Sequence, residues 1–143
     1  GDRVLDLFAG TGGLGLEALS RGAGFALFVD RDPRAVATIE KNLRLLGTER
    51  GRVLRADAFQ GLERLSRSRY HVIFADPPYR FGDRLCGWLE RLSHAALLEP
   101  GGWLVLEHHK KFEIVPPDAL RPYRLRRYGD TAVSIFTASQ EGS

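Results

Sequence analysis

Residues 4–15 read VLDLFAGTGGLG, and this stretch decides the fold class. The run from Val4 to Phe8 is apolar apart from Asp6, as in a strand that is buried in a sheet. Gly10, Gly12 and Gly15 follow in a G-x-G-x-x-G arrangement, and apolar residues at helical spacing then continue up to position 22. A strand, a glycine-rich turn and a helix in this order predict the ligand-binding edge of an open α/β sheet.

The alternation of strand and helix continues along the chain. Asp32 supplies an N-cap, Pro33 a first-turn proline and Gly47 an end for a second helix. Because parallel strands need crossover connections, the repeated pattern predicts a parallel sheet with helices on both faces. The later strands are predicted at 26–29, 52–56, 70–75 and 103–107, the later helices at 33–46, 59–65 and 85–97, and a turn at 100–102.

The last third of the chain changes this rhythm. Two strand-like runs, 123–128 and 131–137, are joined by Gly129 and Asp130, a pair typical of a tight hairpin turn. The sequence therefore predicts an α/β fold whose mostly parallel sheet ends in an antiparallel hairpin. Because no internal repeat or linker-like stretch interrupts the pattern, residues 1–139 are predicted to form a single domain and 140–143 a frayed tail.

The composition excludes several classes of protein. The chain has 143 residues, 43% of them hydrophobic and 27% charged, with a net charge of +3, which excludes disordered, collagen-like and membrane-spanning chains. A lone cysteine, Cys86, excludes an internal disulfide and a cysteine-based zinc site, and it favours the cytoplasm. The chain starts at Gly1, contains no methionine and enters a strand by Val4, so we expect a natural N-terminal segment before it.

The histidines do not predict a metal site. His71 lies within a predicted strand, and His108 and His109 follow another. Adjacent residues of a strand point to opposite faces of the sheet, so His108 and His109 cannot bind one metal ion together. All three histidines are predicted to be structural.

Four aspartates fall at or near the carboxyl ends of the first four strands, the edge where open α/β sheets bind ligands: Asp6, Asp30, Asp57 and Asp76. The glycine fingerprint, with Asp30 twenty residues after Gly10, is typical of dinucleotide binding. However, Asp6 would repel a pyrophosphate, and the glycine turn contains no basic residue. Taken alone, Asp57 fits a helix cap or turn residue. Together, the four carboxylates favour a positively charged ligand with amines and hydroxyls and no phosphate, such as S-adenosylmethionine.

A second motif, Asp76-Pro77-Pro78-Tyr79, directly follows an apolar strand. The two prolines lack backbone N–H groups and hold the preceding residues extended, which leaves carbonyl groups free to accept hydrogen bonds. A carboxylate beside a free carbonyl can hold both N–H groups of an exocyclic amine, while Tyr79 stacks on the base that carries it. The simpler alternative is a loop that ends the strand, with Tyr79 packed on the surface.

These motifs resemble those of a known enzyme family. Residues 6–12, DLFAGTG, are similar to the cofactor loop of class I S-adenosylmethionine-dependent methyltransferases, and DPPY at 76–79 is similar to the catalytic motif of their amino-methylating branch. The runs GLEALSRGA at 15–23, NL at 42–43 and YGDT at 128–131 resemble the bacterial 16S rRNA guanine-N2 methyltransferase family. The resemblance covers nearly the whole chain.

The resemblance implies a Rossmann-like, seven-stranded fold and methyl transfer, without a metal, to the N2 amino group of a guanine. Asp6 and the glycine turn would face the methionine part of the cofactor, Asp30 its ribose and Asp57 its adenine. The family also carries a basic, helical N-terminal segment that covers the cofactor and contacts RNA. The implied catalytic residues are Asp76, Pro77 and Tyr79, and the implied cofactor-binding residues are Asp6, Phe8, Ala9, Gly10, Thr11, Gly12, Asp30, Arg31, Asp57 and Ala58.

The expected partner is 16S rRNA, either free or within an assembling small ribosomal subunit, bound by a monomer. Pro78, Arg80, Lys110 and Lys111 are predicted to lie beside the RNA, although each of these charges also fits a solvated surface. Two alternatives stay open. An adenine-N6 DNA methyltransferase uses the same catalytic motif. A nicotinamide-dependent oxidoreductase or a nucleotide-binding module is supported only by the glycine fingerprint and Asp30.

Overall fold

The computed structural model describes residues 1–65 and 68–140. Its strands are β1 (Arg3–Leu7), β2 (Phe25–Asp30), β3 (Gly51–Arg55), β4 (Tyr70–Ala75), β5 (Leu98–His109), β6 (Leu120–Tyr128) and β7 (Thr131–Ala138). Its helices are α1 (Gly13–Ser20), α2 (Pro33–Leu46) and α3 (Arg84–His94), with short 3-10 helices η1 (Leu62–Leu65) and η2 (Tyr79–Phe81). Of the predicted frayed tail, Gln140 lies in a turn, and 141–143 lie outside the described residues.

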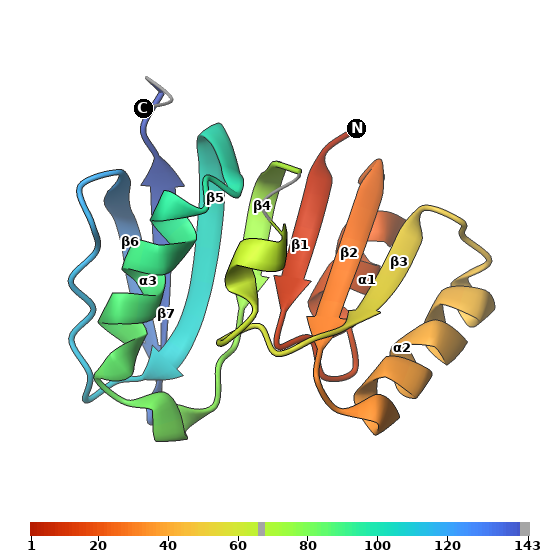
Figure 1. Cartoon of the computed structure of the whole chain (residues 1–143), viewed down its shortest axis with the longest axis horizontal. Coiled ribbons are helices and arrows are strands. Elements are labelled where there is room, and N and C mark those ends of the chain that lie inside the picture. The colour runs from red at the N-terminus through yellow and green to blue at the C-terminus, as the bar shows by residue number, and fades with distance from the viewer. Residues whose placement is uncertain (66–67, 141–143) are drawn as a thin grey trace.

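One seven-stranded sheet joins these strands in the order β3-β2-β1-β4-β5-β7-β6. Strands β1 to β5 run parallel to one another, and β7 lies antiparallel between β5 and β6. The arrow of β7 accordingly points the opposite way from that of β5 in Figure 1. The predicted fold class, a mostly parallel sheet that ends in an antiparallel hairpin, is confirmed.

Helices cover both faces of the sheet, as Figure 1 shows. Helices α1 and α2 pack on one face over a cluster that includes Phe28 and Ile39. Helix α3 and η1 pack on the other face over a larger cluster that includes Trp88. Val4 belongs to the first cluster and Leu5 to the second, because successive side chains of a strand point to opposite faces. Burial on both faces explains why β1 is apolar at almost every position.

The ends of α2 agree with the sequence. Asp32 Oδ1 accepts a hydrogen bond from the Arg34 amide at 2.9 Å and so satisfies one of the free N–H groups of the first turn. Gly47 ends the helix in the left-handed region, with φ of 72°. Residue type alone predicts both helix ends, because the N-cap of Asp32 and the left-handed Gly47 depend only on local contacts.

Three predicted boundaries were wrong. The turn expected at 100–102 is an irregularity inside β5, where Leu98 pairs with Tyr70 but Trp103 pairs with Val72, so β5 carries extra residues that bulge out of the ladder. The helix expected at 85–97 ends at His94, and 59–65 forms a helix only over η1. The irregularity in β5 depends on its pairing with β4, which is distant in sequence, so no local sequence pattern predicts it.

The carboxyl ends of β1, β2, β4 and β5 lie along one edge of the sheet, the lower edge in Figure 1. The hairpin turn between β6 and β7 reaches the same edge, because the Lys110 amide, just after β5, donates to the Asp130 carbonyl at 2.8 Å. The fold thus gathers the loops that carry the predicted site. Within the described part of the chain, the helices are too short or too polar to span a membrane.

Candidate functional site

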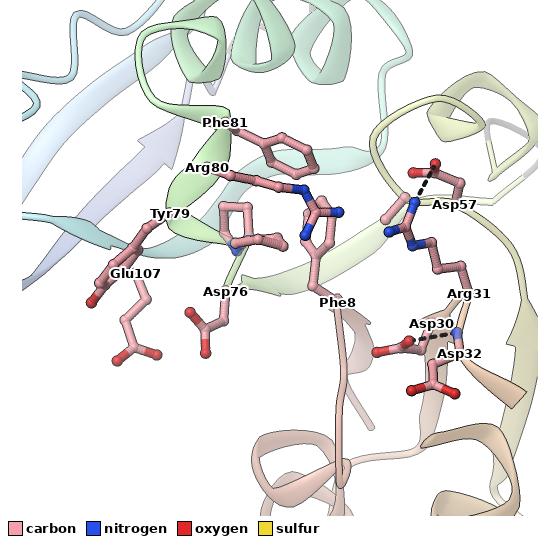
Figure 2. Close-up of a pocket in the computed structure, with 13 residues that line it drawn as sticks. Phe8, Asp30, Arg31, Asp32, Asp57, Asp76, Tyr79, Arg80, Phe81 and Glu107 are labelled. Carbon is pink, nitrogen blue, oxygen red and sulfur yellow. Dashed lines mark hydrogen bonds and ion pairs between the residues drawn. The ribbon is translucent and has the colours of Figure 1, made fainter. Parts of the chain in front are cut away.

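A cavity of about 530 Å³ opens at this edge of the sheet, between the ends of β1, β2, β4 and β5 (Figure 2). Its size suits a ligand somewhat larger than a nucleoside. Five carboxylates and two guanidinium groups line it, so it favours a ligand with net positive charge. The lining residues are Phe8, Asp30, Arg31, Asp32, Asp57, Ala58, Asp76, Pro77, Pro78, Tyr79, Arg80, Phe81 and Glu107.

The glycine loop has the backbone that its sequence predicts. Gly10 and Gly12 adopt φ of 60° and 80°, in the left-handed region that glycine tolerates best. A Cβ on Gly15 would lie 2.3 Å from the ring of Phe28, so this glycine allows α1 to approach β2 closely. Phe8 also has a positive φ, 56°, which is rare for a bulky residue and places its side chain at the cavity wall.

Asp6, the first of the four aspartates, is not among the described residues that line the cavity. Asp6 is buried, and its Oδ2 accepts a hydrogen bond from the Gly15 amide at 3.0 Å, in the first turn of α1. Burial raises the pKa of Asp6 to about 7, against the lowering effect of the Gly15 amide, and the charges of Asp76 and Asp30 raise it further. Asp6 therefore anchors the first turn of α1, where the glycine loop ends, and its carboxyl group changes its charge near neutral pH.

Asp30 connects the glycine loop to the end of β2. Its Oδ2 accepts from the Gly10 amide at 2.9 Å, and its Oδ1 accepts from the Asp32 amide, also at 2.9 Å. These bonds fix the carboxylate at the cavity wall, and each oxygen retains a lone pair for a hydroxyl group. Loop residues Ala9 and Thr11 are held in turn by the Val29 carbonyl and by Asn42 Nδ2.

Asp57 has two different roles at its two oxygens. Its Oδ1 accepts from the amides of Phe59 and Gln60 at 2.8 and 3.1 Å, the turn-forming role that its residue type suggests. Its Oδ2 lies 3.8 Å from Arg31 Nη1, at the cavity wall. The structural interpretation of Asp57 is therefore correct for one oxygen, and the other faces the ligand space.

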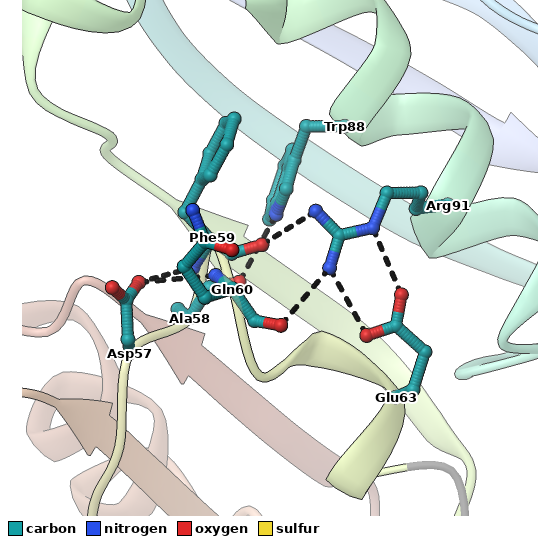
Figure 3. Close-up of polar contacts among 7 residues, drawn as sticks. All are labelled: Asp57, Ala58, Phe59, Gln60, Glu63, Trp88 and Arg91. Atoms are coloured by element: carbon teal, nitrogen blue, oxygen red, sulfur yellow. Dashed lines mark hydrogen bonds and ion pairs between the residues drawn. The ribbon is translucent and has the colours of Figure 1, made fainter.

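The loop that carries Asp57 is held by α3 (Figure 3). Arg91 Nη1 donates to the Phe59 carbonyl at 2.7 Å, and its Nε and Nη2 bind both carboxylate oxygens of Glu63 at 2.8 and 3.0 Å. Trp88 Nε1 donates to the Ala58 carbonyl at 3.0 Å. One helix thus fixes the backbone at the cavity-lining Ala58 and at Phe59, the residue that follows it.

Asp76 lies next to a second carboxylate. Ala75 of β4 pairs with Leu106 of β5, so the residues that follow, Asp76 and Glu107, are neighbours on adjacent strands. Figure 2 shows their carboxylates close together on the open side of the cavity. Partial desolvation, followed by the charge and hydrogen bonding of Glu107, raises the pKa of Asp76 to about 6.

Tyr79 packs against the hairpin end of the sheet. Its hydroxyl lies 2.6 Å from Thr131 Oγ1, and its ring meets the ring of His109 edge-on, with centroids 5.3 Å apart. The ring is 45% exposed and lines the cavity beside Asp76. On the far side of the cavity the wall is aromatic, because Phe81 stacks on Phe59 and Phe8 lies against Phe81.

The predicted RNA contacts separate into two groups. Pro78 and Arg80 line the cavity, whereas Lys110 and Lys111 line a second cavity of about 550 Å³ beside β6 and β7. Lys110 Nζ lies 3.5 Å from Asp130 Oδ1.

The histidines make structural contacts. His108 is buried and bonds Ser134 Oγ at 2.8 Å, and His71 Nδ1 accepts from the Arg3 amide at 2.9 Å. Residues 1–65 and 68–140 contain no cluster of side chains arranged to hold a metal ion.

Sequence reasoning missed three lining residues: Asp32, Phe81 and Glu107. The rule that found the four aspartates, an acid at the carboxyl end of a parallel strand, also applies to Glu107 at the end of the run 103–107. Asp32 was assigned only as a helix cap, and no sequence signal marks Phe81.

Comparisons with known proteins agree with this geometry. The family described as "Conserved hypothetical protein 95" matches residues 1–137. The protein YlbH of Bacillus subtilis is 39% identical over 142 residues, which are 95% of this chain and 76% of YlbH. The ribosomal RNA small subunit methyltransferase D of Escherichia coli is 39% identical over 105 residues, 73% of this chain, and the match spans 49% of that protein's length.

Solved structures share the fold. The HI0767 protein of Haemophilus influenzae superposes with a TM-score of 0.88 at 26% identity, over 96% of this chain and 87% of that chain. SMU.776, solved in complex with S-adenosylhomocysteine, has a TM-score of 0.81 at 15% identity, over 96% of this chain and 45% of that one. At that identity the second likeness shows the fold alone. From the match over 1–137 and the identity to YlbH, the chain belongs to the family described as conserved hypothetical protein 95.

Proposed function

We propose that this chain transfers a methyl group from S-adenosylmethionine to the exocyclic N2 amino group of a guanine in 16S rRNA. One observation carries the proposal: Asp76 and the Pro77-Pro78 pair lie at the mouth of a carboxylate-lined cavity, beside the glycine loop. Asp76 and the Pro77 carbonyl together form an acceptor site for an amino group, whereas the Pro78 carbonyl already accepts from the Phe81 amide at 3.2 Å. The name of the E. coli relative supports ribosomal RNA of the small subunit as the substrate.

The residues present fit S-adenosylmethionine. Asp30 can accept hydrogen bonds from ribose hydroxyls, and Asp57 Oδ2 can accept from the adenine amine while Arg31 and the aromatic wall flank the base. The glycine loop at 8–15 contains no lysine or arginine to neutralise a pyrophosphate. When bound, the cofactor supplies a methyl group on a positively charged sulfur, which the acidic lining favours electrostatically.

The chain's own residues would position the amine and accept its proton. Asp76 and the Pro77 carbonyl hold the two N–H groups, and Tyr79 supports the extruded base. As the N–C bond forms and the C–S bond breaks, the nitrogen must lose a proton, and Asp76 is placed to receive it. Most of the rate would come from alignment of the reacting atoms. Because its pKa is about 6, Asp76 is mostly ionised at neutral pH, as an acceptor must be.

The first experiment measures the product. The protein is incubated with methyl-labelled S-adenosylmethionine and either free 16S rRNA or small-subunit particles, and the RNA is digested and analysed by mass spectrometry. We expect N2-methylguanosine, at one mapped position. N6-methyladenosine would instead support the adenine-modifying alternative. Comparison of the two substrates tests whether the enzyme recognises free rRNA or the assembled subunit. The proposal also includes that the enzyme is a monomer and acts in the cytoplasm.

A variant separates catalysis from cofactor binding. Asp76→Ala should retain S-adenosylhomocysteine binding in calorimetry and lose at least 100-fold in methyl transfer, since the acceptor is removed and the cofactor contacts remain. NADH serves as the control ligand and should not bind. Loss of S-adenosylhomocysteine binding in Asp76→Ala would contradict the role given to this residue, and binding of NADH would contradict the proposed cofactor.

A further inference from the structure

Glu107 is a lining residue to which the proposed function gives no role. It lies on β5, one residue beyond the pair that Leu106 makes with Ala75, so it stands beside Asp76 across the two parallel strands. Asp76 lies one residue beyond the end of β4, and the side chains of both residues line the same cavity. Figure 2 shows the two carboxylates reaching the open side of the cavity together, with Tyr79 next to them.

No basic group neutralises this pair in the described part of the chain. The ion pairs of residues 1–65 and 68–140 involve other carboxylates. Of the two arginines that line the cavity, Arg80 has its guanidinium over the ring of Phe81, with 5.3 Å to the centroid, and Arg31 lies 3.8 Å from Asp57. Two neighbouring carboxylates are unfavourable unless a proton or hydrogen-bond donors lie between them. Desolvation raises the pKa of Asp76, and the charge of Glu107 raises it further.

The bases differ in how many donors they offer to such a pair. The Watson–Crick edge of guanine has two donors side by side, the N1–H and the N2 amino group. Adenine has one donor, its amino group, beside N1, which is an acceptor in the neutral base. Adjacent carboxylates thus match guanine and leave one lone pair facing another when adenine enters. An unmatched polar contact inside a site discriminates strongly between ligands.

We propose that Glu107 is the specificity-determining residue of this site, its carboxylate accepting the N1–H of the target guanine while Asp76 and the Pro77 carbonyl hold the N2 amino group. The proposal rests on the proposed function and deepens it, because it explains why this cavity takes guanine and not adenine. It assigns Glu107 to recognition and leaves the transfer of the amine proton to Asp76.

The test exchanges the donor on the base and the acceptor on the protein. The RNA fragment around the mapped guanine is prepared with guanine or with 2-aminopurine at that position, ligated into 16S rRNA and assembled where the particle is required. 2-Aminopurine retains the N2 amino group, but its N1 is an acceptor. Wild type should methylate guanine about 10- to 100-fold faster than 2-aminopurine, the range expected for one hydrogen bond to a charged group.

Glu107→Gln should abolish or reverse this preference. Its side-chain amide can donate to N1 of 2-aminopurine, whereas its neutral oxygen accepts the guanine N1–H less strongly than a carboxylate does, so guanine methylation should fall by about tenfold while 2-aminopurine methylation holds or rises. Calorimetry with S-adenosylhomocysteine checks that the variant is folded and retains the cofactor site. Glu90→Gln, an exposed residue on α3, is the matched control and should keep the preference of the wild type.

Equal loss on both bases in Glu107→Gln would overturn the proposal and leave the proposed function intact, since wild type would still produce N2-methylguanosine. Absence of N2-methylguanosine with wild type is the separate failure of the proposed function. A preference that moves only in Glu107→Gln supports recognition of N1, because a structural defect would not discriminate between the two bases.

Discussion

Asp6 combines burial with a carboxyl group that changes its charge near neutral pH. Its pKa is about 7 in the folded chain, because burial disfavours the charged form more than the Gly15 amide favours it. In the unfolded chain the pKa returns to its ordinary value of 3.8. The folded state therefore holds the proton more tightly, so this group stabilises the fold fully below about pH 3.8, and its contribution is lost as the pH rises through about 7.

Asp6→Asn should remove this pH dependence. Asparagine retains an oxygen that can accept from the Gly15 amide and never ionises, so its stability should not fall for this reason as the pH rises. Between pH 5 and pH 8 the wild type should lose about 2–3 kcal/mol of unfolding free energy relative to the variant. Urea denaturation at each pH measures it, with the exposed Asp118→Asn as the control. A constant difference between wild type and Asp6→Asn would contradict the raised pKa.

Residue type predicted which aspartates lie at the cavity better than it predicted the contacts that each side chain makes. The rule of acids at strand ends brought Asp30, Asp57 and Asp76 to one cavity. It could not reveal that Asp6 is buried under α1, because the direction of a side chain depends on which face of the strand the helix covers. It also could not pair Asp76 with Glu107, because the register between β4 and β5 passes through an irregularity.

At the scale of elements, α3 supports the cavity without lining it. Arg91 binds two loop carbonyls, those of Phe59 and Gln60, and both oxygens of Glu63. The same loop presents Asp57 and Ala58 to the cavity. Buried or partly buried carbonyls that lose their donor must be hydrated or remain unsatisfied, so the loop should become looser when Arg91 is removed.

Arg91→Met should therefore weaken cofactor binding, although Arg91 is not among the residues that line the cavity. Methionine retains most of the apolar stem and removes the donors, so we expect a loss of about 1–2 kcal/mol in stability and of roughly tenfold in affinity for S-adenosylhomocysteine. Calorimetry and urea denaturation measure the two effects. Arg44→Met, on the exposed side of α2, is the control. Unchanged affinity in a destabilised Arg91→Met would mean that α3 supports the fold and not the cavity.

Elements with local signals were predicted well, and those that depend on distant partners were not. The N-cap of Asp32 and the left-handed Gly47 fixed both ends of α2 as expected. The start of β5 was misplaced, because Pro100 and Gly101 are typical of a turn, yet Leu98 before them already pairs with Tyr70 of β4. Residues 99–102 bulge out of the ladder, and the pairing that places them inside the strand involves residues distant in sequence, which no short window contains.

At the scale of the molecule, the parallel strands and the final hairpin bring separate parts of the chain to one edge. The cavity lies at the ends of β1, β2, β4 and β5, and Tyr79 connects it to the hairpin through Thr131. Lys110 and Lys111 follow β5 directly, and Lys110 contacts the hairpin turn at Asp130. The sequence predicted only that the carboxyl ends of the first four strands share this edge, because the strands are parallel, and the place of the hairpin turn needed the structure. The distances within it needed the structure.

This convergence predicts which lysines contact RNA. The chain has three lysines, and two of them, Lys110 and Lys111, lie at the catalytic edge, while Lys41 lies on α2. If both contact phosphates, changing them to glutamine should weaken RNA binding and reduce the slope of log affinity against log salt by about 1–2, since each phosphate contact releases close to one counterion. Filter binding of 16S rRNA over a range of salt concentrations measures the slope, and Lys41→Gln should leave it unchanged. If Lys110 is held by Asp130, only Lys111 contributes, and Lys110→Gln alone should leave the slope unchanged. An unchanged slope in the double variant would exclude both lysines from the RNA interface. Arg80, which lines the cavity with Asp76, would then remain as the basic residue predicted to lie beside the RNA.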